Sequence, residues 1–84
     1  MKRIEDLNKT EMALVINQKL KELEDGIERG LLDYESWKKI VDISYRFLQS
    51  GGRSKLISGR FTRMSNKVTE IMREEKSNFI IIGG

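Results

Sequence analysis

The chain contains no cysteine and no histidine. The absence of cysteine excludes disulfides and thiolate chemistry, and the absence of both residues excludes a Cys/His zinc site. The absence of histidine also removes the commonest general acid–base group. No pair of a nucleophile and a base is visible, and three short helices offer little room for a cleft. We therefore expect a protein that is not an enzyme and that holds no cofactor and no metal.

Proline and long hydrophobic runs are also missing. Without proline nothing forbids long helices. No apolar run approaches the ~20 residues of a transmembrane helix, and Met1–Asp6 lacks the apolar core of a signal peptide. We expect a cytoplasmic protein with no membrane contact. The 84 residues form one predicted domain, residues 1–84, whose small size makes stability marginal.

Acidic residues are absent between Asp42 and Glu70. Residues 1–50 carry nine basic and ten acidic side chains, whereas residues 51–84 carry seven basic and three acidic ones. The net charge of +3 therefore hides a basic C-terminal half. A local positive field of this kind attracts phosphates or acidic protein surfaces.

Two helices are predicted in the first 50 residues. Asn8 followed by Glu11 has the spacing of a capping box, and Gly30 is a typical helix stop, which predicts a helix over about 9–29. Asp33 is the next N-cap, and Leu32 with Trp37 has the spacing of a hydrophobic staple. Two glycines at 51–52 end this second helix, which is predicted over about 34–49.

A third helix is predicted over about 54–76, where apolar residues recur in steps of four and three. Gly59 inside it indicates a kink or a close contact with another helix. In the tail, residues 77–84, the segment Phe79–Ile82 is rich in β-branched residues and reads as a short strand or a docked segment.

These elements predict an all-α protein, a three-helix up-down-up bundle with a short extended C-terminal tail. A helix-turn-helix fits less well, because its first helix is usually about half as long as the helix over 34–49 and its turn is tighter. The predicted core consists of Met12, Ile16, Leu20, Leu23, Ile27, Trp37, Ile40, Val41, Phe47, Leu48, Ile57, Phe61, Met64, Val68 and Ile71.

Apolar residues left outside this core predict a homodimer or a larger oligomer, because exposed apolar patches mark interfaces. The tail is expected to pair across a two-fold axis or to pack into the partner subunit. The surplus residues are Leu14, Val15, Leu31, Ile43, Leu56, Met72 and the segment Phe79–Ile82.

Two polar strips flank the apolar seam of the third helix. The basic strip suits charge neutralisation of phosphates, and the hydroxyl strip suits neutral hydrogen bonds to them. The structural alternative is that arginine and lysine stems cover apolar surface and that small hydroxyl residues let another helix approach. The basic strip is Arg53, Arg60, Arg63 and Lys67, and the hydroxyl strip is Ser54, Ser58, Thr62, Ser65 and Thr69.

Other features are open to two interpretations. Tyr45, beside Arg46, could stack on a base, although a tyrosine at the rim of a protein interface is commoner. The helix start at 51–54 could cradle a phosphate, although a plain cap is the simpler interpretation. The acidic cluster over 22–28 is surrounded by Lys19, Lys21 and Arg29, and we interpret it as a solvated face rather than a metal site.

The sequence therefore predicts a small basic accessory protein that binds RNA or DNA backbone with weak sequence specificity. The alternative is a regulatory adaptor or inhibitor, of the small basic kind found in phages and mobile elements, that docks an acidic protein surface. Salt dependence separates them, because backbone binding weakens steeply with salt. The predicted contact residues are Arg46, Arg53, Lys55, Arg60, Arg63 and Lys67, with Tyr45 at the margin.

Overall fold

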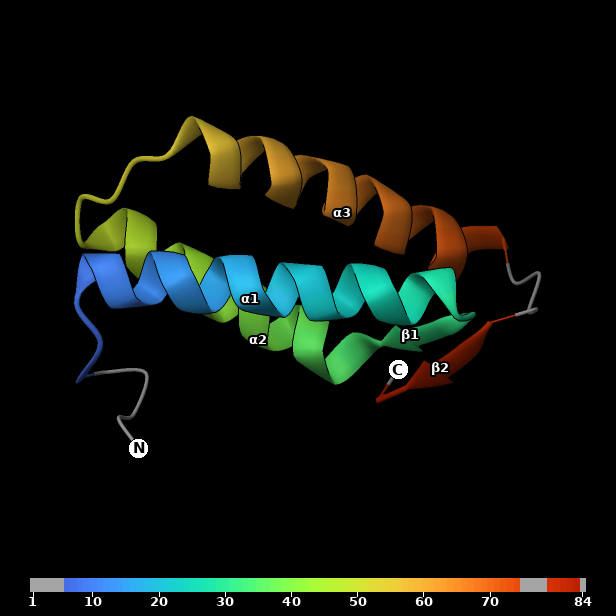
Figure 1. Ribbon diagram of the computed structural model, residues 1–84. Helices are drawn as coiled ribbons and strands as arrows, with labels where there is room; N and C mark the ends of the chain where they lie inside the picture. Colours follow the sequence, from blue (N-terminus) through green and yellow to red (C-terminus); the bar gives the residue numbers. More distant parts are fainter. Residues whose placement is uncertain (1–5, 75–78, 84) are drawn as a thin grey trace.

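The computed structural model describes residues 6–74 and 79–83. It contains three helices, α1 (Lys9–Glu28), α2 (Tyr34–Gln49) and α3 (Lys55–Glu74), and two short strands, β1 (Leu31–Asp33) and β2 (Ile80–Ile82) (Figure 1). The prediction of a mostly helical protein with three helices is confirmed. The predicted end of the third helix, at about residue 76, lies outside the described residues.

The helix ends follow from local side-chain chemistry. The Asn8 side chain accepts a hydrogen bond from the Glu11 amide at 2.8 Å, and the Glu11 carboxylate accepts one from the Asn8 amide at 3.1 Å. The predicted capping box is thus confirmed. Asp33 caps α2 by accepting from the Ser36 amide at 3.1 Å. Gly30 follows α1 with φ of 83°, a conformation that glycine adopts without steric cost.

The tail pairs with the chain's own β1 strand. Strand β2 lies parallel to β1, with Leu31 opposite Ile80 and Asp33 opposite Ile82. The Ile80 amide also donates to the Gly30 carbonyl at 2.8 Å. The sequence indicated a strand in the tail but not its partner, because three residues between two helices carry no strand pattern of their own. The all-α prediction therefore needs this correction, a small two-stranded sheet at one end of the molecule.

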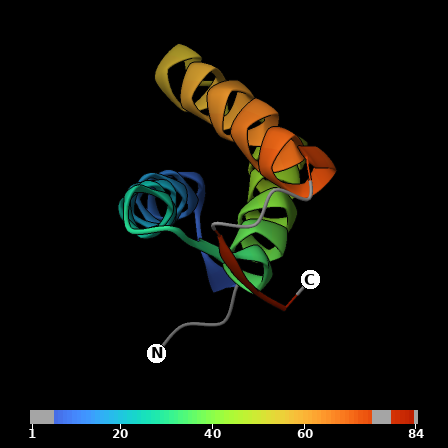
Figure 2. The same ribbon diagram turned by 90° about the vertical axis from the view of Figure 1, so that its right-hand side faces the viewer.

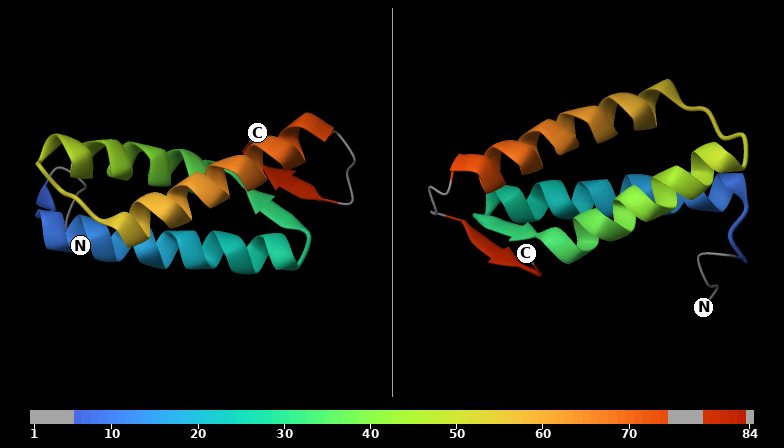
Figure 3. Two further views of the ribbon diagram at one scale, coloured as in Figure 1. Left: turned by 90° about the horizontal axis from the view of Figure 1, so that it is seen from above. Right: turned by 180° about the vertical axis from the view of Figure 1, so that it is seen from behind.

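Helix α3 crosses the other two helices diagonally. In Figure 1, α1 and α3 run from left to right, and α2 returns from right to left behind α1. The end view and the view from above show the N-terminal end of α3 over α1 and its C-terminal end over the start of α2 (Figures 2 and 3). Because α3 lies across the pair, it diverges from α2 at one end and from α1 at the other. Each divergence leaves a groove.

The buried core differs from the predicted one in α2. Val41 and Leu48, predicted as core, are 42% and 54% exposed, whereas Ile43, predicted as surplus, is 1% exposed. Leu32 is fully buried as well. Because α1 covers α2 while α3 diverges from its second half, the buried stripe of α2 turns toward α1. Phe61 and Ile71 are only partly buried. The buried apolar residues are Met12, Ile16, Leu20, Leu23, Ile27, Leu32, Trp37, Ile40, Ile43, Phe47, Ile57, Met64 and Val68.

No helix within residues 6–74 and 79–83 combines the length and the apolar character needed to cross a lipid bilayer.

Candidate binding surfaces on two sides of α3

The first surface, the charged groove, lies between the second half of α1 and the middle of α3. It is an open depression of about 620 Å³. Its α1 wall carries two carboxylates, Glu24 and Glu28, and its α3 wall carries three cations, Arg60, Arg63 and Lys67. Ile27, Met64 and Phe79 complete the lining. The structure thus gathers three predicted contact residues in one place, and it places acidic side chains directly opposite them.

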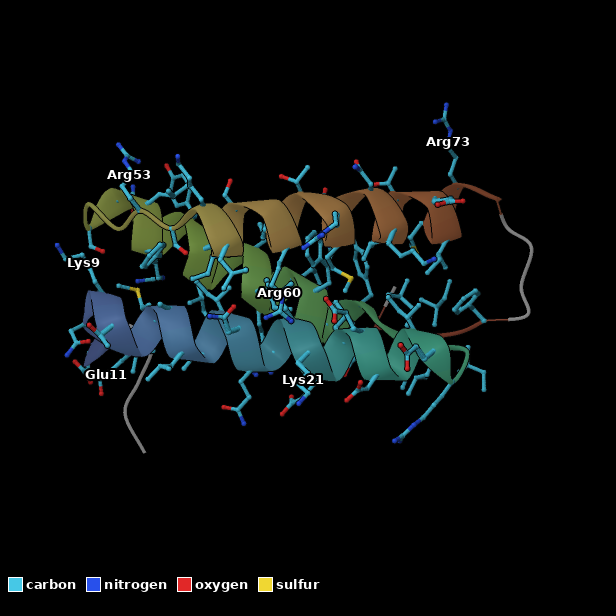
Figure 4. The ribbon with its side chains drawn as sticks, turned by 45° about the horizontal axis from the view of Figure 1, so that its top comes forward. Lys9, Glu11, Lys21, Arg53, Arg60 and Arg73 are labelled. Carbon is cyan, nitrogen blue, oxygen red and sulfur yellow. The ribbon has the colours of Figure 1, made fainter. Side chains whose placement is uncertain are left out.

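Arg60 makes contacts within the chain. Its Nη1 donates to the Asn17 Oδ1 atom at 3.1 Å, and its Nη2 lies 3.6 Å from Glu24 Oε1. The side chain is 22% exposed and points from α3 toward α1 (Figure 4). The guanidinium therefore links α3 to α1 through these two contacts. A hydrogen bond of this kind contributes about 1 kcal/mol to stability, whereas an ion pair to a half-exposed carboxylate contributes less.

The other cations remain exposed, in two groups. Arg53 and Lys55 lie at the start of α3, and Arg63 and Lys67 lie on the charged groove. None of these four has an ion-pair partner among residues 6–74 and 79–83. Figure 4 shows Arg53 pointing away from the bundle.

Two further predicted contact residues lie on α2. Arg46 pairs with Asp42, with its Nε 3.4 Å from Oδ2, and both side chains are exposed. Tyr45 is 63% exposed. The predicted contact residues are therefore all on the surface apart from Arg60, but they do not form one continuous strip.

The second surface, the apolar groove, lies where α3 diverges from the second half of α2. Its volume is about 240 Å³, below the roughly 300–1,000 Å³ of typical small-molecule sites. It therefore suits one or two inserted apolar side chains rather than a drug-sized ligand. The lining residues are Val41, Ser44, Tyr45, Phe47, Leu48, Ser54, Ile57, Ser58 and Phe61.

Two serines of the apolar groove differ in their hydrogen bonding. Ser54 caps α3 by accepting from the Ile57 amide at 3.2 Å. The Ser44 Oγ atom is buried and has no hydrogen-bond partner among the described residues. An unpaired buried hydroxyl costs about 1–3 kcal/mol of stability.

Sequence reasoning missed the apolar groove, although its signal was present. Val41, Tyr45 and Leu48 follow one another in steps of four and three, which marks one face of a helix. Two of them were assigned to the core because the pattern shows that a face is apolar but not what covers it. The expected close helix contact at Gly59 was wrong, since a Cβ placed there meets nothing within 4 Å in the described structure.

The described residues contain no group of three or more acidic side chains placed to hold a metal ion. A scan of family models found none that matches the chain, and searches of curated proteins and of solved structures found no match either. The grooves themselves are therefore the observations on which a function can be based.

Proposed function

We propose that this chain is a protein-binding adaptor that docks an acidic partner through the surface formed by α2 and α3. The observation that carries the proposal is the apolar groove with its exposed rim residues Val41, Tyr45 and Leu48. A contiguous apolar patch on a small protein marks an interaction site. Residues 43–69, which supply most of this surface, contain no carboxylate, so their field favours an acidic partner.

The charges favour this adaptor over nucleic-acid binding. A phosphate entering the charged groove would meet Glu24 and Glu28, and Arg60 would have to leave Asn17 to reach it. The apolar groove has no such opposing charge in its lining.

The adaptor is tested with Val41→Glu/Leu48→Glu, which places charge on the apolar rim. Cross-linking in nuclease-treated lysate, followed by mass spectrometry, would identify captured proteins. The matched control is Leu14→Glu, the same change at a leucine that is 65% exposed on α1. We expect an acidic protein to be captured by the parent and by the control and to be lost with the double variant. Equal capture by all three proteins contradicts the proposal.

Binding of RNA or DNA backbone is the second candidate, favoured by the four exposed and unpaired cations Arg53, Lys55, Arg63 and Lys67. If it operates, log affinity falls linearly with log salt, and each lost phosphate contact lowers the slope by roughly 0.7–0.9. The test is Arg63→Glu/Lys67→Glu, with Arg60 retained because of its contact with α1. Unchanged binding by this variant, or no binding by the parent, removes the candidate.

We also propose that the up-down-up bundle assembles as a cytoplasmic homodimer through β2. The backbone amide and carbonyl groups of successive residues in a strand point toward opposite edges of that strand. Because the Ile80 amide donates toward β1, the amide and carbonyl of Ile81 point away from β1. Two such edges can pair antiparallel around a two-fold axis. Ile81→Pro removes the outward donor, and we expect sedimentation equilibrium to show a monomer. Ile81→Val is the control, and a monomeric parent protein contradicts the assembly.

A further inference from the structure

We propose that the occupant of the apolar groove is an amphipathic helix of the partner protein, with an apolar face flanked by carboxylates. The inference rests on the proposed adaptor function and names the partner's chemistry. The helix would lie between α2 and α3 as a fourth element of the bundle, with one or two large apolar side chains inserted between Val41, Leu48 and Phe61.

The shape of the groove matches a helix. Both walls are helical. One is formed by residues 41–48 of α2 and the other by residues 54–61, the cap and first turns of α3, and each is about 10 Å long at 1.5 Å per residue. A groove between two helices is filled by the side chains of a third helix that meet it at i, i+3 or i+4, and i+7. The small volume of about 240 Å³ limits the insertion to an anchor side chain or two.

Serine residues on the walls favour a close approach. Ser58 is exposed on α3, and Ser44 contributes a short side chain to the α2 wall. Short side chains let the backbone of a docked helix come near.

The charge of the surface around the apolar groove favours a helix of a partner protein over a second copy of this chain as the occupant. The segment 43–61 contains four cations and no carboxylate. Arg46 pairs with Asp42, and Arg60 contacts Asn17 and Glu24 in the charged groove. The cations without an ion-pair partner among the described residues are Arg53 and Lys55, which flank Ser54 of the groove lining. A second copy docked by the same surface would bring these cations of the two copies toward one another, and like charges across an interface disfavour the complex. A helix flanked by glutamate or aspartate is attracted to the same surface, and its on-rate rises through electrostatic steering.

The experiment uses a synthetic acetylated peptide of about 18 residues, long enough to form a helix in water, with leucine at positions a and d of the heptad and glutamate at e and g. Two control peptides are compared, one with the same composition scrambled and one with lysine in place of glutamate. None contains tryptophan, so the emission of Trp37, the chain's single tryptophan, reports binding. Trp37 packs against Phe61 of the groove wall, with ring centroids 5.1 Å apart.

We expect the glutamate peptide to bind at least about tenfold more tightly than either control, a difference of about 1.4 kcal/mol. Val41→Glu/Leu48→Glu should weaken it by at least the same factor, and Leu14→Glu should leave it unchanged. If the scrambled peptide binds as tightly as the glutamate peptide, the occupant is not an amphipathic helix. If the lysine peptide binds more tightly, the occupant does not carry acidic flanks.

The inference and the proposed function fail in distinguishable ways. If no peptide binds, but the parent captures a partner that the groove variant loses, the helical occupant is wrong and the adaptor stands. If no peptide binds and capture does not depend on the groove, both are wrong.

Discussion

The indole of Trp37 and the phenyl ring of Phe61 lie 5.1 Å apart, centroid to centroid, with their planes inclined by 31°. This contact joins α2 to α3 next to the apolar groove, and Trp37 is only 8% exposed. Tilted aromatic pairs at this separation contribute about 0.5–1.5 kcal/mol beyond the burial of their area. The pair therefore anchors α3 at the point where it crosses α2.

Removing the indole should destabilise the fold severely. We expect Trp37→Ala to lower the free energy of unfolding by about 3–5 kcal/mol, which is a large share of the total for a domain of this size. Trp37→Phe keeps an aromatic ring opposite Phe61 and should cost less. Urea unfolding followed by circular dichroism measures both. A loss below about 1 kcal/mol for Trp37→Ala would show that α3 does not depend on this contact.

The orientation of α2 can be tested by comparing a buried and an exposed residue of similar size. Ile43 is 1% exposed, so Ile43→Ala should cost about 2–5 kcal/mol. Leu48 is 54% exposed on the apolar groove, so Leu48→Ala should change stability by no more than about 0.5 kcal/mol. Thermal and urea unfolding of both variants measure the two losses of stability. A larger loss for Leu48→Ala than for Ile43→Ala would mean that α2 presents the opposite face to α1.

The contact between Arg60 and Asn17 should appear as an energetic coupling. We expect a double-mutant cycle with Arg60→Ala and Asn17→Ala to give about 0.5–1.5 kcal/mol. Glu24→Gln should cost less and its effect should diminish in high salt, because that carboxylate is 45% exposed and its ion pair is screened. A coupling energy near zero would contradict the structural role of Arg60 and would make its guanidinium a candidate phosphate ligand again.

Two glycines should respond to alanine in opposite directions. A Cβ at Gly59 meets nothing within 4 Å, so Gly59→Ala inside α3 should stabilise the protein by about 0.5–1 kcal/mol. A Cβ at Gly52 would collide with the buried Phe47 ring, so Gly52→Ala should destabilise by about 1–3 kcal/mol. Melting temperatures of the two variants provide the measurement. A destabilising Gly59→Ala would reveal a contact that the described structure lacks.

The candidate site was only half visible in the sequence. The acid-free stretch and the exposed cations Arg53, Lys55, Arg63 and Lys67 follow directly from residue types. The inward direction of Arg60 does not, because its angle on α3 places it at the edge of the apolar seam, where only the position of α1 decides between solvent and a partner. Asn17, its hydrogen-bond acceptor, is 43 positions away and carries no signal of its own.

The sequence by itself determined the presence of three helices and the ends of α1 and α2, since capping by Asn8 and Asp33 and the stop at Gly30 act over a few residues. It also determined which faces are apolar. Only the tertiary structure decided which apolar residues are buried, because α3 crosses α1 and α2 diagonally and leaves Val41 and Leu48 uncovered. The pairing of β2 with β1 likewise depends on contacts between segments about fifty positions apart, and no local preference encodes such a contact.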